Sequence, residues 1–169
     1  LKEYKIDITL VGDVTKIKDV CKSEGIDVNL FKIVHSDSVI SMNDAGSDIM
    51  KKYADSSMAV GLKLLAAGEG DGFVTAGNSG AVCVGATLLV KRIKGISRPG
   101  FAPILPGMNG HFMLLDSGAN LQCRPEMFRQ FGLMGSIYMN KVMGVDNPRV
   151  GLANVGTEEH KGTETHQEA

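Results

Sequence analysis

The fold is decided by the stretch Phe73-Val74-Thr75-Ala76-Gly77-Asn78-Ser79-Gly80-Ala81. A short apolar run, predicted as a strand over 73–75, meets a Gly-Asn-Ser-Gly turn, and a helix-like run follows over 79–93. Gly77 and Gly80 let a ligand approach the backbone closely because they have no Cβ. The first amide groups of a helix lack an intrahelical acceptor and favour an anion, and Asn78 and Ser79 add side-chain donors. The stretch therefore predicts a phosphate or carboxylate cradle.

The composition is that of a globular protein without nucleic-acid character. Hydrophobic residues make up 43% of the 169 residues and charged residues 22%, and the formal net charge is −1. This length suggests one domain with a substantial core, and the charge gives no reason to expect nucleic acid as a partner. Cys21, Cys83 and Cys123 are an odd number without metal-ligand spacing, which favours a reduced, cytoplasmic compartment. The longest apolar stretch, 81–90, is too short to span a bilayer.

Strands and helices are predicted to alternate along the chain. The predicted strands lie at 5–11, 28–34, 73–75, 101–105, 111–116 and 149–155. The predicted helices lie at 13–23, 47–67, 79–93 and 125–143. This alternation predicts a doubly wound, mostly parallel α/β sheet with helices on both faces, formed by a single domain over 1–169.

Three polar, glycine-containing loops each follow a predicted strand, at 75–81, 116–120 and 154–159. Ligands of open α/β sheets bind outside the carboxyl ends of the strands, so parallel strands would bring the three loops to one edge. The alternative is that each loop is an ordinary turn between a strand and a helix.

Familiar cofactor motifs are missing from the sequence. Gly68-Glu69-Gly70-Asp71-Gly72 precedes a predicted strand and has its third glycine one residue early for a dinucleotide site. The chain has no phosphate-binding loop with a Gly-Lys-Ser/Thr ending, no nucleophile elbow and no zinc-type histidine spacing. We therefore expect no bound cofactor and assign no metal ligand.

Cys123 follows the second loop and has two interpretations. It is either a nucleophile that accepts an acyl group or a partly buried structural thiol, and the second is favoured.

Two further clusters are also open to two interpretations. Lys91, Arg92, Lys94 and Arg98 form either a solvated helix end or a docking patch for an acidic protein. The predicted helix at 125–143 carries a stripe that favours core or a subunit interface over a lipid groove. Its members are Met127, Phe128, Phe131, Met134, Tyr138, Met139 and Met143.

Together these motifs resemble the phosphate acyltransferase (PlsX) family of bacterial phospholipid synthesis, over nearly the whole chain. The matching segments are Asp55-Ser56-Ser57-Met58, Thr75 to Ala81, Arg92-Ile93-Lys94-Gly95-Ile96-Ser97-Arg98-Pro99, Asp116-Ser117-Gly118-Ala119-Asn120, Cys123-Arg124-Pro125-Glu126, Met134-Gly135-Ser136-Ile137-Tyr138, Asn147-Pro148-Arg149-Val150-Gly151-Leu152, and Asn154-Val155-Gly156-Thr157-Glu158-Glu159 with Lys161-Gly162. The resemblance implies a fold similar to isopropylmalate dehydrogenase and phosphotransacetylase, usually in a homodimer.

The resemblance also implies transfer of a fatty acyl group from acyl carrier protein to inorganic phosphate, and it leaves peripheral membrane association open. On this reading, Asn120 and Asp116 would serve catalysis, with Asp116 orienting its neighbours. The substrate-binding residues would be Gly77, Asn78, Ser79, Gly80, Asn154, Gly156, Thr157 and Lys161. Lys161 would offset phosphate charge, although a surface lysine is an equal alternative.

Three other functions are kept as alternatives. They are a phosphotransacetylase-type enzyme that uses coenzyme A thioesters, an inactive phosphate-binding or dimerising fragment, and a nicotinamide-linked oxidoreductase. The oxidoreductase is disfavoured because no fingerprint glycines or ribose-binding acid are correctly placed.

The chain departs from the family pattern in two respects. Proteins of the family are longer and begin with a glycine-rich Asp-Ala-Met-Gly-Gly-Asp segment that is absent here, so we expect a fragment lacking both ends. Where the family has Pro-x-x-Ala-x-Arg-x-Lys, this chain has Gly46, Ile49, Lys51 and Tyr53. The missing second cation weakens the expectation that this segment supplies two positive charges to phosphate.

Overall fold

The structure is a computed structural model that describes residues 4–108, 110–158 and 160–169. The chain forms two compact units, with the division between Arg92 and Ile93. The expectation of a single domain over 1–169 stays a prediction.

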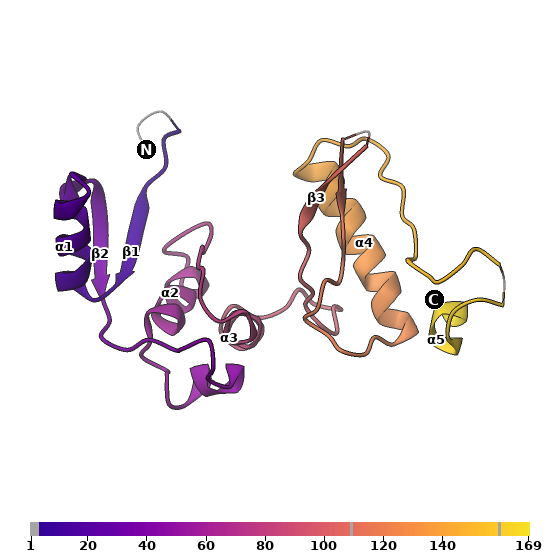
Figure 1. The fold of residues 1–169 in the computed structure, drawn as a ribbon, viewed down its shortest axis with the longest axis horizontal. Coiled ribbons are helices and arrows are strands. Elements are labelled where there is room, and N and C mark those ends of the chain that lie inside the picture. The colour runs from indigo at the N-terminus through magenta and orange to yellow at the C-terminus, as the bar shows by residue number, and fades with distance from the viewer. Residues whose placement is uncertain (1–3, 109, 159) are drawn as a thin grey trace. The chain divides into compact units, whose positions relative to one another are not determined.

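The first unit begins with a parallel strand pair covered by a helix (Figure 1). β1 (Ile8–Gly12) pairs with β2 (Phe31–His35) so that Ile8 lies opposite Phe31 and Gly12 opposite His35. Between them lie α1 (Val14–Ser23) and the 3-10 helix η1 (Val28–Leu30). The Asp13 side chain caps α1 by accepting hydrogen bonds from the amides of Thr15 and Lys16, at 2.9 and 3.2 Å.

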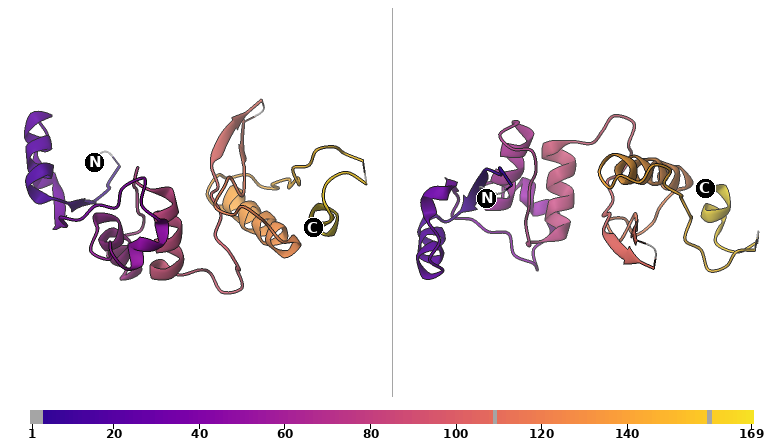
Figure 2. Two further views of the ribbon diagram at one scale, coloured as in Figure 1. Left: turned by 60° about the horizontal axis from the view of Figure 1, so that its bottom comes forward. Right: turned by 90° about the horizontal axis from the view of Figure 1, so that it is seen from above.

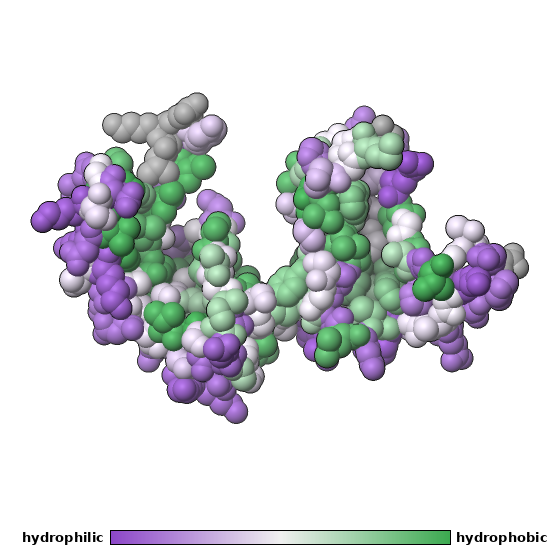
Figure 3. Space-filling view, viewed as in Figure 1, coloured by the Kyte–Doolittle hydropathy of each residue, from purple (hydrophilic) through white to green (hydrophobic). Residues whose placement is uncertain are grey.

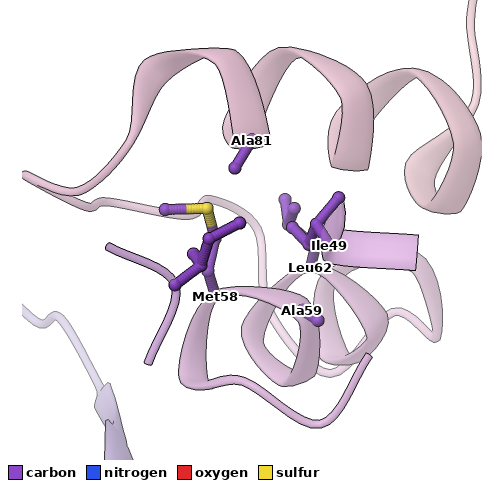
Figure 4. Close-up of a cluster of buried hydrophobic side chains, with 6 residues drawn as sticks. Ile49, Met58, Ala59, Leu62 and Ala81 are labelled. Atoms are coloured by element: carbon purple, nitrogen blue, oxygen red, sulfur yellow. The ribbon is translucent and has the colours of Figure 1, made fainter. Parts of the chain in front are cut away.

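The core of the first unit lies between its later helices, as the close-up shows (Figure 4). The 3-10 helix η2 (Gly46–Met50) is followed by α2 (Ser57–Ala66) and α3 (Ser79–Gly85), and α3 runs on without a break into the π-helix η3 (Ala86–Val90). Two further views show α2 and α3 next to each other (Figure 2). The buried apolar side chains at this contact are Ile40, Ile49, Met58, Ala59, Leu62 and Ala81.

Gly85 explains how closely these helices approach. A Cβ on Gly85 would lie 2.5 Å from a methyl carbon of Leu62 and 2.9 Å from one of Ile49. A larger residue would therefore push α3 away from α2 and from η2, since core side chains are close-packed and yield little.

The second unit packs a hairpin against its longest helix. β3 (Ile104–Gly107) and β4 (Gly110–Met113) are antiparallel, with Ile104 opposite Met113. α4 (Pro125–Lys141) begins at Pro125, which suits a first-turn position because proline has no amide hydrogen to leave unsatisfied. Gly135 of α4 faces the end of β4, where a Cβ would lie 3.5 Å from the sulfur of Met113. The short helix α5 (Glu164–Glu168) follows.

The structure confirms a mixed α/β chain, and the residues it describes form two small sheets of two strands each. Several predicted elements are wrong. The segments 73–75 and 149–155 form no strand, since neither pairs with another segment of the described chain. The predicted helix at 47–67 is two helices, because Ser56 caps α2 and interrupts the run, with its hydroxyl 3.3 Å from the amide of Ala59.

Four predicted strands form only in part. The segment 5–11 is a strand only from Ile8, and the segment 101–105 is a strand only from Ile104. The segment 28–34 begins as η1 and becomes a strand from Phe31, and the segment 111–116 is a strand only as far as Met113. β4 pairs antiparallel with β3, so this part of the sheet departs from the expected parallel arrangement.

Large apolar side chains reach the surface in both units, where they colour patches of the space-filling view green (Figure 3). Val74 is 96% exposed and Val155 is 87% exposed, and both lie in segments predicted as strands. Among the helices of the described ranges, none has the length and apolar composition needed to span a bilayer.

Candidate functional site

The first candidate loop belongs to the first unit and leads into α3. Gly77, Ser79 and Gly80 are exposed, whereas Asn78 is buried at 7% exposure. The amide of Gly77 donates to the hydroxyl of Thr75 at 3.1 Å, which closes a tight turn before the helix. Ser79 and Gly80 occupy the first two positions of α3, where amide groups have no intrahelical acceptor. These two amides are the donors that the loop offers to an anion.

The side chain of Asn78 does not point at a ligand, contrary to the sequence-based expectation. Its oxygen accepts the amide of Ala81 at 2.9 Å and so caps α3. Its nitrogen donates to the carbonyl oxygens of Ser41 and Asp44, both at 2.9 Å. Both hydrogens of the amide are therefore engaged by the backbone, and Asn78 shapes the loop.

The second candidate loop is organised by the carboxylate of Asp116. Oδ1 accepts the amides of Phe101 and Ala119, at 2.7 and 3.1 Å. Oδ2 accepts the amide and the side-chain nitrogen of Asn120, at 2.7 and 3.0 Å. That nitrogen also donates to the carbonyl oxygen of Pro99 at 2.8 Å. Asp116 and Asn120 thus tie 99–101 to 116–120, and the catalytic role expected for both residues stays a prediction.

This network sets the ionisation of Asp116 and of its neighbour Cys123. Burial alone would raise the pKa of Asp116, but the hydrogen bonds from the Asn120 side chain and from three amides outweigh it and lower the pKa. Burial raises the pKa of the Cys123 thiol, and the charge of Asp116 raises it further. Cys123 therefore stays protonated near neutral pH, which opposes its use as a nucleophile.

The third candidate loop lies in the second unit before α5. The side chain of Asn154 donates from its nitrogen to the carbonyl oxygen of Lys161 at 3.1 Å, and its oxygen accepts the amide of Val155 at 2.8 Å. Gly162 is in close contact with this amide, since a Cβ there would lie 2.7 Å from the Asn154 oxygen. Asn154 therefore closes the loop on itself.

Gly156, Thr157 and Lys161 complete this loop, and Glu159 lies outside the described residues. Thr157 is exposed. The Lys161 ammonium is 4.0 Å from a carboxylate oxygen of Glu158, and its side chain is 42% exposed. An ion pair this open is weak, so Lys161 is accessible to an incoming anion.

An open hollow of about 450 Å³ adjoins the third loop. Its lining residues are Ala153, Asn154, Val155, Gly162, Thr163 and His166. His166 is fixed there by Thr163, whose hydroxyl lies 2.8 Å from Nδ1, and its ring centroid is 5.6 Å from that of Phe128. Sequence reasoning missed His166, because a single histidine in a short terminal helix carries no motif.

The structure thus brings together the residues within each candidate loop. Gly77, Asn78, Ser79 and Gly80 lie in the first unit, and all other candidates lie in the second. Convergence of the three loops at one sheet edge stays a prediction.

The segment 46–53, where this chain departs from the family pattern, lies in the first unit. Gly46 begins η2, Ile49 is in the core, and Lys51 follows η2. Tyr53, where the family has a lysine, packs against that core and hydrogen-bonds with the carboxylate of Asp44. In this chain Tyr53 therefore supports the segment containing Ser41 and Asp44, whose carbonyl oxygens accept hydrogen bonds from Asn78.

Comparisons with known proteins agree with the resemblance seen in the motifs. A family model described as "Fatty acid synthesis protein" matches residues 1–169. The chain is 43% identical over 163 residues to the phosphate acyltransferase of Acetivibrio thermocellus, covering 96% of this chain and 48% of that protein.

Two further relatives with the same name show the same pattern. Identity is 46% over 164 residues to the protein of Caldanaerobacter subterraneus subsp. tengcongensis, with 97% of this chain and 48% of that protein covered. It is 41% over 170 residues to the protein of Clostridium tetani, with 100% and 51% covered. The chain spans about half the length of the curated relatives that it matches. With a family model matched along its whole length, the chain belongs to the phosphate acyltransferase (PlsX) family of fatty acid synthesis proteins.

Proposed function

We propose that the complete protein containing this chain transfers a fatty acyl group from acyl carrier protein to inorganic phosphate and so supplies acyl phosphate for phospholipid synthesis. Membership of the family supports the reaction class. The observation that carries the proposal is the first turn of α3, where Ser79 and Gly80 are exposed residues whose amide groups have no intrahelical acceptor. Such a turn suits a phosphate dianion, because amide hydrogens and the helix dipole both favour negative charge.

The reaction is a direct displacement at the thioester carbonyl. An oxygen of hydrogen phosphate attacks the carbonyl carbon, a C–O bond forms, the C–S bond breaks, and the phosphate proton ends on the released thiol. A thiolate leaves readily, so positioning of the phosphate and donors to the developing oxyanion supply most of the rate. This mechanism needs no enzyme nucleophile, in keeping with the protonated state of Cys123.

The remaining candidates have supporting roles in this proposal. Asp116 and Asn120 hold their loop in shape. Thr157 and Lys161 add a hydroxyl and a positive charge for phosphate, while Asn154 and Gly156 shape the turn that carries them. We further propose that the three loops meet in the complete protein, within a doubly wound sheet and a homodimer.

A pair of variants at Ser79 tests the amide contribution in the complete protein. Ser79→Pro removes the amide donor, yet proline is tolerated at the first position of a helix, and the extended backbone of Asn78 (ψ 110°) accepts a following proline. Ser79→Ala removes only the hydroxyl. We expect Ser79→Pro to raise KM for phosphate by about 10- to 100-fold, as loss of a hydrogen bond of ~1.5–3 kcal/mol to a charged group predicts. Ser79→Ala should have a much smaller effect, and equal effects of the two variants would count against the amide cradle.

A further inference from the structure

Asn78 joins two segments that are far apart in the sequence. The residues 41–46, here called the strap, lie more than thirty positions before it, and its side-chain nitrogen holds the strap through the carbonyls of Ser41 and Asp44. The same side chain caps α3 through Ala81. Asn78 is 7% exposed and its bonds to the strap are partly buried, so breaking one of them leaves the buried side chain without a partner for a polar atom.

Gly46, at the end of the strap, makes the second contact. A Cβ on Gly46 would lie 2.6 Å from the carbonyl carbon of Gly80, 2.7 Å from its oxygen and 2.9 Å from the nitrogen of Ala81. These atoms are all backbone, so they cannot turn aside as a flexible side chain does. The strap therefore lies directly on the backbone of the first turn of α3, and only glycine permits this spacing.

Contacts of Asp44 within the first unit also fix the shape of the strap. The carboxylate of Asp44 accepts the amide of Ser41 at 2.8 Å. This bond is the main cause of a lowered pKa at Asp44, and a hydrogen bond with the Tyr53 side chain lowers it further. Since Tyr53 packs on the core, the strap is connected to the interior of the unit as well as to α3.

We propose that the strap is a wall of the phosphate cradle and that Asn78 and Gly46 are positioning residues, which fix the strap against α3 and so aim the amides of Ser79 and Gly80. This inference rests on the proposed function, because it assigns these contacts to phosphate binding. The physical reason is that a cradle of backbone amides works only when they converge on one point, and a loop that can shift does not hold them there. The competing explanation is that these contacts only stabilise the fold.

Three variants of the complete protein separate these explanations. Asn78→Ser keeps a hydroxyl that can cap α3 but is too short to reach the strap. Gly46→Ala removes no hydrogen-bonding group, but its added Cβ forces the strap away from Gly80. Gly72→Ala is the matched control, since a Cβ there meets nothing within 4 Å and its backbone is not in the left-handed region. KM values for phosphate and for the acyl donor are measured separately, together with the midpoint of thermal unfolding.

The expected result is an increase of about tenfold or more in KM for phosphate in Asn78→Ser and in Gly46→Ala, with KM for the acyl donor changed less than about twofold. Gly72→Ala should match the wild type in both. The proposal is overturned if KM for phosphate is unchanged, or if only kcat and the unfolding midpoint fall, which is the signature of a purely structural role. A wild-type protein that forms no acyl phosphate would instead contradict the proposed function. In that case the role of the strap is tested by titration with inorganic phosphate. Equal dissociation constants for the wild type and Gly46→Ala would show that the strap is not a wall of the phosphate cradle.

Discussion

At the scale of single residues, the side chain of Asp116 is the most heavily hydrogen-bonded candidate. Its two oxygens accept four hydrogen bonds, and the resulting pKa lies below the ordinary value of 3.8. A lowered folded-state pKa means that the carboxylate stabilises the folded protein fully above the unfolded-state pKa. That stabilisation is lost as pH falls through the folded-state value, and so below about 3.8.

Replacement by asparagine tests this directly. Asp116→Asn places a side-chain NH₂ or a weaker acceptor against donors that now meet a carboxylate, so we expect a loss of ~1–3 kcal/mol in the free energy of unfolding at neutral pH. The loss should shrink as the pH is lowered below 3.8, because the wild type then also loses its carboxylate charge. Chemical denaturation of both proteins across pH measures it, and a difference that does not depend on pH would contradict the account.

Cys123 provides a second prediction at this scale. Burial and the nearby Asp116 raise its pKa, so the thiolate that nucleophilic catalysis needs is scarce. Cys123→Ser should therefore keep acyl-phosphate formation within about twofold of the wild type, whereas loss of a catalytic nucleophile costs several orders of magnitude. Abolished activity in a folded Cys123→Ser protein would revive the covalent mechanism.

At the scale of elements, local signals identified the starts of α1 and α4 but did not decide every strand. Asp13 before α1 and Pro125 at the start of α4 are confirmed, because a capping side chain or a proline acts on its own neighbours. The predicted strands at 73–75 and 149–155 are wrong, because a strand exists only through a partner that the local pattern does not specify.

The same distinction explains what was predictable at the candidate site. The contacts of Asp116 with Ala119 and Asn120 lie within four residues, whereas the contact of Asp116 with Phe101 and that of Asn120 with Pro99 reach 15 and 21 residues along the chain. Asn78 was expected to donate to a ligand, but its partners at 41 and 44 are 37 and 34 residues away. No pattern within the Gly-Asn-Ser-Gly turn could reveal that contact.

The basic segment before β3 leads to a prediction at the element scale. Within the second unit, Lys94 and Arg98 are exposed close to Ile93, which is 75% exposed. Gln130 of α4 holds the intervening residues in place, with its side-chain oxygen 2.8 Å from both the amide and the hydroxyl of Ser97. If this surface docks an acidic carrier protein, charge reversal should weaken that encounter selectively.

We expect the double variant Lys94→Glu, Arg98→Glu to raise KM for acyl carrier protein about tenfold or more and to leave KM for an acyl coenzyme A donor unchanged. Lys18→Glu, Lys22→Glu on α1 is the matched control, since it makes the same change in charge at exposed positions. Equal effects of the two double variants would show that net charge alone matters, and the segment would then be an ordinary solvated turn.

At the scale of the whole molecule, the family match accounts for the reaction class and the structure accounts for the groups that could carry it out. The first unit holds the α3 amides and the strap, and the second unit holds the Asp116 network and Lys161. The central claim is that these parts act on phosphate and an acyl thioester in the complete protein.

The most direct test is an assay of the purified complete protein with inorganic phosphate and either acyl carrier protein or coenzyme A as the acyl donor. The reaction is measured as the release of free carrier-protein or coenzyme A thiol that depends on added phosphate, because hydroxylamine trapping would also consume the thioester donor. The account predicts acyl-phosphate formation that saturates with phosphate, depends on the Ser79 amide and prefers the carrier protein as donor. Formation only from the coenzyme A thioester would contradict the carrier-protein donor, and no acyl phosphate from either donor would contradict the account as a whole.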